Sequence, residues 1–160
     1  MSASRPCLLG ALALLAPTLT GAAGYPAVLK PCELLTMAQV ATVLPQSQPG
    51  WVAANGASLI TGVKSYQCSY ITPAMHGLTV IATVAENDAA FAKIAPSKSM
   101  HEDDRPVAIA DRGWVFGGEN DLKVAAVKGR TLIDLELTAP GAGLKADALV
   151  ELARAVAKQV

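Results

Sequence analysis

The segment Lys30-Pro-Cys-Glu-Leu-Leu-Thr-Met-Ala-Gln-Val40 constrains the fold more than any other part of the chain. It places Cys32 just before a strong helix start, and the only cysteine further along is Cys68. The capping-box pattern Thr36–Gln39 predicts a helix over residues 36–44. A bond between the two cysteines would therefore tie this helix to the element that carries Cys68.

The first residues have the three-part pattern of a secretory signal peptide. Arg5 supplies the positive charge, residues 7–16 form an apolar run, and small residues fill 18–24. The run is well short of the roughly 20 apolar residues that a membrane-spanning helix needs. The sequence therefore predicts a signal peptide over 1–24, no transmembrane anchor after cleavage, and a periplasmic or secreted protein.

Export bears directly on the two remaining cysteines, because disulfides persist in oxidising compartments. An even pair in an exported chain suits a disulfide. A metal site and a reactive thiol are the alternatives, but two cysteines without a nearby histidine have poor spacing for zinc. We therefore expect Cys32 and Cys68 to form a disulfide bond.

Composition favours one globular domain over residues 25–160, which is long enough to bury a core. Hydrophobic residues make up 52% of the chain but aromatic residues only 4%, so the core must be aliphatic. Lys and Arg together number 13, as do Asp and Glu, and no basic stripe stands out. This balance argues against a nucleic-acid partner.

Alternating polar and apolar residues predict two antiparallel hairpins. The first joins strands over 64–72 and 78–84. The second joins strands over 122–128 and 131–138 through a turn at Lys128-Gly-Arg130. In the last strand, Leu and Ile alternate with Asp134 and Glu136, which predicts one buried side and one solvated side.

The remaining elements complete an expected α+β fold. Short strands are expected over 107–110 and 113–116, a short middle helix over 86–95, and an amphipathic C-terminal helix over 144–159. We expect a largely antiparallel sheet of about five strands, with the N-terminal, middle and C-terminal helices covering it. Residues 45–65 are the least regular part, and either a short strand over 57–63 or a mobile flap fits them.

Candidate contact residues are few. Trp51 is interpreted either as a cap on the edge of the core or as a contact residue of a binding loop. Trp114 is assigned either to the core or to an exposed contact surface. We name Trp51 and Trp114 as candidate binding residues and assign no catalytic residue, no metal ligand and no cofactor.

Two histidines leave an enzyme open as an alternative. His101-Glu-Asp-Asp104 is the densest polar cluster, and it suggests either a divalent metal site or a solvated loop. His76 falls in the turn of the first hairpin. No serine has a Gly-x-Ser-x-Gly context, yet catalytic triads assemble in space and not along the sequence. A small hydrolase that uses His76 or His101 is therefore the alternative class.

The segment Pro31-Cys-Glu-Leu-Leu-Thr-Met-Ala-Gln-Val40, followed by Cys68-Ser-Tyr70, resembles a family. Small secreted envelope proteins of actinobacteria, often lipoproteins and of unknown function, have a similar Cys-x-Leu-Leu-Thr pattern, as do proteobacterial proteins. The chain departs from it in having Gln39 in place of the usual acid and no lipidation cysteine. The resemblance implies the disulfide and an α+β sandwich, and it implies no activity.

These observations together favour a binding or interaction module of the cell envelope over an enzyme. The expected partner is another envelope protein or a small ligand. A small periplasmic hydrolase is one alternative. An inhibitor of a secreted enzyme, which would use the 45–65 segment as its probe, is another.

Overall fold

A computed structural model describes residues 29–53, 56, 58–95, 105–118, 120–139, 143 and 146–160. The signal peptide predicted over 1–24 and the polar cluster at 101–104 lie outside these residues. Strands take up 42% of the described residues and helices 23%. In this part of the chain no helix is long and apolar enough to cross a membrane.

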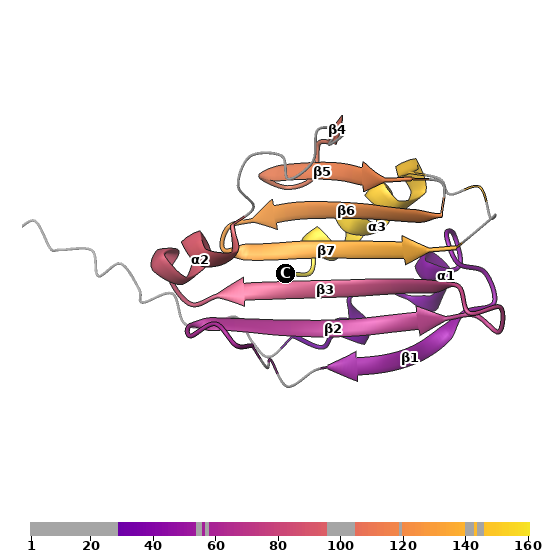
Figure 1. The fold of residues 1–160 in the computed structure, drawn as a ribbon, viewed down its shortest axis with the longest axis horizontal. Helices are drawn as coiled ribbons and strands as arrows, with labels where there is room; N and C mark the ends of the chain where they lie inside the picture. The colour runs from indigo at the N-terminus through magenta and orange to yellow at the C-terminus, as the bar shows by residue number, and fades with distance from the viewer. Residues whose placement is uncertain are drawn as a thin grey trace, which may run out of the picture.

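Seven strands form one antiparallel sheet in the order β1-β2-β3-β7-β6-β5-β4 (Figure 1). The strands are β1 (Gln48–Ala53), β2 (Val63–Ile71), β3 (Gly77–Ala85), β4 (Arg105–Pro106), β5 (Arg112–Gly117), β6 (Asp121–Lys128) and β7 (Thr131–Thr138). The helices are a 3-10 turn η1 (Pro31–Glu33), α1 (Met37–Val40), α2 (Asp88–Ile94) and α3 (Ala146–Ala157).

The expected α+β fold with a sheet of about five strands is therefore wrong: the sheet has seven strands and dominates three small helices. Strand β1 falls in the segment where we expected either a strand over 57–63 or a flap. Its residues are all exposed or half-exposed and a bulge interrupts its pairing, so it lacks the alternation that marks a strand. The strand expected over 107–110 is also absent, and only Arg105–Pro106 pairs there.

Both predicted hairpins are confirmed. Strands β2 and β3 pair along their whole length, and β6 and β7 pair around a two-residue turn. In that turn Gly129 has a φ of 55°, a conformation that favours glycine. Regular alternation and a glycine turn are strong local signals, and here they fix the register.

The N-terminal helix is much shorter than predicted, since α1 spans only Met37–Val40 before a series of turns. Its capping box is confirmed: the Thr36 hydroxyl accepts from the Gln39 amide at 3.2 Å. In return the Thr36 amide donates to Gln39 Oε1 at 2.8 Å. Val40 and Leu44 are buried in the core, so their position depends on one short helical turn and its cap.

We expect Thr36→Ala to lower the free energy of unfolding by about 1 kcal/mol, because the Gln39 amide loses its side-chain acceptor. Urea denaturation followed by circular dichroism measures this change. Thr61→Ala, at an exposed position in a turn, is the matched control and should have little effect. Equal losses in both variants would contradict a stabilising role for the cap.

One face of the sheet carries the main core. Alternate residues of β2, β3, β6 and β7 point to this face and pack against α3, α1 and η1, which lie behind the sheet in Figure 1. Helix α3 buries Leu149, Leu152, Ala153 and Val156 there, as its amphipathic pattern predicts.

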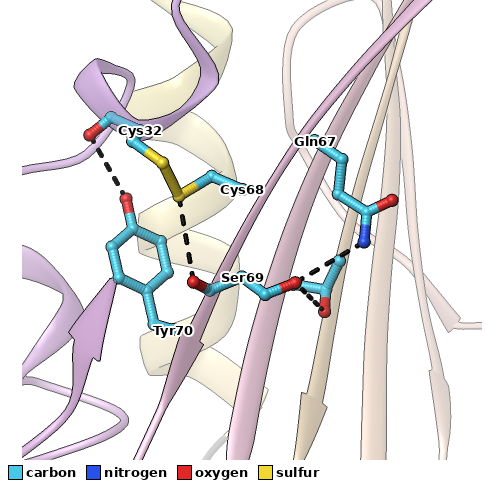
Figure 2. Close-up of a disulfide and its surroundings, with 6 residues drawn as sticks. Cys32, Gln67, Cys68, Ser69 and Tyr70 are labelled. Atoms are coloured by element: carbon cyan, nitrogen blue, oxygen red, sulfur yellow. Dashed lines mark hydrogen bonds between the residues drawn. A yellow bond between two sulfur atoms is a disulfide. The ribbon is translucent and has the colours of Figure 1, made fainter. Parts of the chain in front are cut away.

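The predicted disulfide between Cys32 and Cys68 is confirmed, and it joins η1 to β2 (Figure 2). Their Cα atoms lie 5.2 Å apart, and Cys68 is fully buried. Next to the bond, the Tyr70 hydroxyl donates to the Cys32 carbonyl oxygen at 3.4 Å. The bond therefore fastens the N-terminal turns to the covered face of the sheet.

The sheet consists of two meanders joined by a central seam. Strands β1, β2 and β3 follow one another in space as in sequence, and so do β4, β5, β6 and β7. The seam is the antiparallel pair β3–β7, in which Gly77 lies opposite Thr138 and Val84 opposite Thr131. Helix α2 follows β3 at one end of the sheet (Figure 1).

Candidate functional site: the open face of the sheet

The second face of the sheet, which we call the open face, has no described helix over its centre. Residues that lie opposite each other in an antiparallel pair share a face, so the register assigns its members. The central part of the open face includes Ser65, Gln67, Ser69, Thr79, Ile81, Thr83, Trp114, Phe116, Lys123, Ala125, Leu132, Asp134 and Glu136. Most of them are half-buried.

Helix α2 covers only one end of this face. Its Ala90, Phe91 and Ile94 pack with Val63 and Ala85 in a cluster separate from the main core. By the register, Val63 and Ala85 lie on the same face as Ser65 and Thr83, at the end that α2 covers. The centre of the face is therefore a surface of side chains that have no covering layer among the described elements.

Hydroxyl and amide groups dominate the β2–β3 half of the open face. Ser65 Oγ lies 3.2 Å from Thr83 Oγ1, and Ser69 Oγ lies 3.3 Å from Thr79 Oγ1. The Gln67 side chain donates to Ser69 Oγ at 3.5 Å. Figure 2 shows Gln67 extending to the side of β2 opposite the disulfide. These cross-strand pairs leave further lone pairs and donors for an external partner.

Asp134 occupies the centre of the open face, directly between Ile81 of β3 and Ala125 of β6. Desolvation by these neighbours, with a smaller contribution from the nearby Glu136 charge, raises the pKa of Asp134 to about 6. No other described residue pairs with its carboxylate by a hydrogen bond or a salt bridge. At neutral pH this site therefore holds a poorly solvated negative charge that has no hydrogen-bond or salt-bridge partner among the described residues.

Lys123 is the nearest cation on this face, but it is engaged elsewhere. Its Nζ donates to Glu136 Oε1 at 2.9 Å. That hydrogen bond is the main cause that raises the pKa of Lys123. Three influences act on the pKa of Asp134, and the attraction of the Lys123 charge, which lowers this pKa, is the smallest of them. Asp134 is thus left without a dedicated partner although a lysine lies close by.

The two candidate tryptophans lie far apart in the sheet. Trp114 is half-buried on the open face in β5, with the Arg112 guanidinium carbon 5.7 Å from its ring centroid. Trp51 is 59% exposed in β1, at the opposite edge of the sheet. The structure therefore does not bring them into one site.

His76 lies apart from the open face, at a pocket of about 290 Å³ near the β2–β3 turn. The pocket is lined by Val43, Leu44, Pro45, Gln46, Thr72, Pro73, Ala74, His76 and Ala139. The His76 amide donates to Thr72 Oγ1 at 3.2 Å. The lining includes no carboxylate, serine or cysteine, so it supplies neither the acid nor the usual nucleophile of a hydrolytic triad.

The other histidine, His101, and its acidic neighbours lie outside the described residues. Within the described ranges, no group of three or more His, Cys, Asp or Glu side chains is arranged to hold a metal ion.

Asp134, the residue that best distinguishes the open face, was not singled out from the sequence. In the sequence, the alternation of Asp134 with Leu and Ile indicates the solvated side of a strand. The sheet order is needed to show that neighbouring strands enclose this residue.

Comparison of the chain with protein-family models, with curated proteins and with solved structures found no match. The resemblance to secreted envelope proteins therefore stays a prediction that rests on the Cys32 segment alone.

Proposed function

We propose that this protein is an exported, non-catalytic binding module of the cell envelope that uses the open face of its sheet to bind a partner protein. The partner's contact surface would present a lysine or arginine side chain over Asp134. The single observation that carries the proposal is the position of this carboxylate, without a partner among the described residues, at the centre of a sheet face that no described element covers.

The energetics of Asp134 support a role in binding. A partly desolvated carboxylate without a directly paired cation destabilises the folded state, and proteins retain such groups mainly where function needs them. A basic side chain from a partner would supply the missing compensation. Hydrogen bonds to charged groups contribute roughly 1.5–3 kcal/mol, which is enough to select one partner surface over others.

The surroundings of Asp134 suit a protein partner. One row across five strands contains Gln67, Ile81, Asp134, Ala125 and Trp114. At about 4.8 Å per strand this row is roughly 19 Å wide. Apolar and aromatic centres next to hydroxyl, amide and charged groups are typical of non-obligate protein interfaces.

Export is supported by two independent features. The first 24 residues have the composition of a signal peptide, and the disulfide suits an oxidising compartment such as the periplasm or the cell exterior. The resemblance of the Cys32 segment to secreted envelope proteins agrees with both. N-terminal sequencing of the protein from the extracellular or periplasmic fraction tests the cleavage near Ala23.

Photo-crosslinking in intact cells tests the binding face. A crosslinking amino acid at Gln67 should capture a discrete partner, whereas the same amino acid at Lys158, an exposed residue after α3, should not. Asp134→Asn should weaken the crosslink about tenfold or more, because the charged interaction is lost. Asp147→Asn, an exposed acid on α3, is the matched control and should leave it unchanged.

Capture from Lys158 as strong as from Gln67, or capture at Gln67 that is insensitive to Asp134→Asn, would contradict the proposal. The hydrolase alternative predicts a different result. Turnover in a hydrolase panel that His76→Ala abolishes would reverse the ranking of the two functions. Inhibition of a secreted enzyme through residues 45–65 would instead leave both Asp134 and His76 variants fully active.

A further inference from the structure

The two edges of the sheet are protected very differently. The β4 edge is two residues long and consists of Arg105 and Pro106, a charged residue and one that cannot donate a backbone hydrogen bond. Short strands, charges and proline are the usual means by which proteins keep edge strands from pairing with other chains. The β4 edge therefore has several of these protections.

The β1 edge has far less protection. It is six residues long, and no described element pairs with its outer side. Trp51 and Val52 in it are 59% and 46% exposed. Pro49 and a bulge lie toward its start, so the segment from Trp51 to Ala53 is the part that remains free to pair.

Charge is also missing around this edge. Residues 34–63 contain no Asp, Glu, Lys, Arg or His. A strand that pairs with its own copy brings each residue close to the same set of residues, so any charge in it would meet a like charge. The β1 edge avoids this repulsion entirely, which favours a second copy of this chain over a partner selected by charge.

We propose that two copies of this protein associate through antiparallel pairing of their β1 strands. The pairing is isologous, with a two-fold axis near Val52, so that Trp51 of one copy lies close to Ala53 of the other. The large Trp51 side chain of each copy then lies next to the small Ala53 side chain of the other copy. The two sheets become one continuous sheet, and both open faces are directed to the same side.

The contact is small, so the dimer is weak and forms reversibly. Sedimentation velocity of the oxidised protein over a concentration series should show a monomer–dimer equilibrium. Trp51→Lys should shift the midpoint of dimerisation at least tenfold to higher concentration, since the edge then carries a like charge in both copies. Ala92→Lys, at an exposed position of α2, is the matched control and should dimerise as the wild type does.

Folding of the variants is checked by their circular dichroism and by their intact disulfide, and Val52→Lys provides a second edge variant at an exposed position. Hydrogen exchange of the 51–53 amides should slow as protein concentration rises.

A monomer at every concentration, a dimer unaffected by both edge variants, or edge protection seen only with a foreign protein bound would overturn the proposal. Trp51→Lys should retain the Gln67 crosslink, so this test is independent of the open-face proposal.

Discussion

Removal of the Cys32–Cys68 bond is expected to lower the free energy of unfolding by about 4 kcal/mol. The two cysteines are 36 residues apart, and in the chain-entropy model a closed loop of this length restricts the unfolded chain by that amount. Reduction with a phosphine under otherwise identical conditions leaves both side chains in place. Urea denaturation of the oxidised and reduced protein measures the difference.

A Cys32→Ala, Cys68→Ala double variant is the control for this measurement. It should be less stable than the oxidised protein by about 4 kcal/mol or more, because Cys68 is fully buried and its loss also leaves a small cavity. The reductant should not change its stability. If reduction leaves the urea midpoint of the wild type unchanged, the disulfide does not stabilise the fold.

Asp134→Asn is expected to stabilise the protein by about 3 kcal/mol at pH 7. The pKa of Asp134 is raised from 3.8 to about 6, so the folded state disfavours the ionised form that is present at neutral pH. Asparagine has the same shape without the charge. Thermal or urea denaturation at pH 7 measures the gain, and Asp147→Asn on exposed α3 should give almost none.

The pH dependence of the same variant gives an independent test. A raised folded-state pKa means that the folded protein binds more protons than the unfolded chain between about pH 4 and 6. This group therefore makes the wild type more stable as pH falls through that window. The advantage of Asp134→Asn over the wild type should shrink from pH 7 to pH 4. An advantage that does not vary with pH would exclude the charge as its cause.

Asp134 thus links stability to the proposed binding. The substitution expected to stabilise the fold is also the one expected to weaken the crosslink to a partner. Such opposition between stability and function is common at binding sites, where groups are held ready for a partner at the expense of the free state. A variant that gained stability and kept full binding would separate the two effects.

Local signals in the sequence predicted much of this fold. The capping box at Thr36, the Gly129 turn and the alternation in β7 each describe residues that interact with close neighbours in sequence, and each is present in the structure. Strand β1 was not predicted in its place. Its residues are exposed at an edge, so no burial pattern marks it, and only pairing with β2 defines it.

The candidate site was harder to predict for the same reason. The disulfide follows from two cysteines and a predicted signal peptide, which are both read from the sequence alone. The environment of Asp134 depends on β6, its predicted hairpin partner, and also on β3, which flanks β7 only because of the strand order. Trp51 and Trp114 were grouped as contact residues, yet they belong to opposite ends of that order.

The seam between β3 and β7 has a consequence for the order of folding. Pairs within each meander lie close in sequence, whereas the seam joins Gly77 to Thr138 and must wait until most of the chain is available. The disulfide joins η1 to β2, so both of its cysteines precede the seam strands in the sequence. In the proposed exported protein, oxidation can therefore lock the N-terminal segment onto β2 before the C-terminal meander docks. We expect seam formation to be the slow step, which pulse-labelling hydrogen exchange of β3 amides would detect.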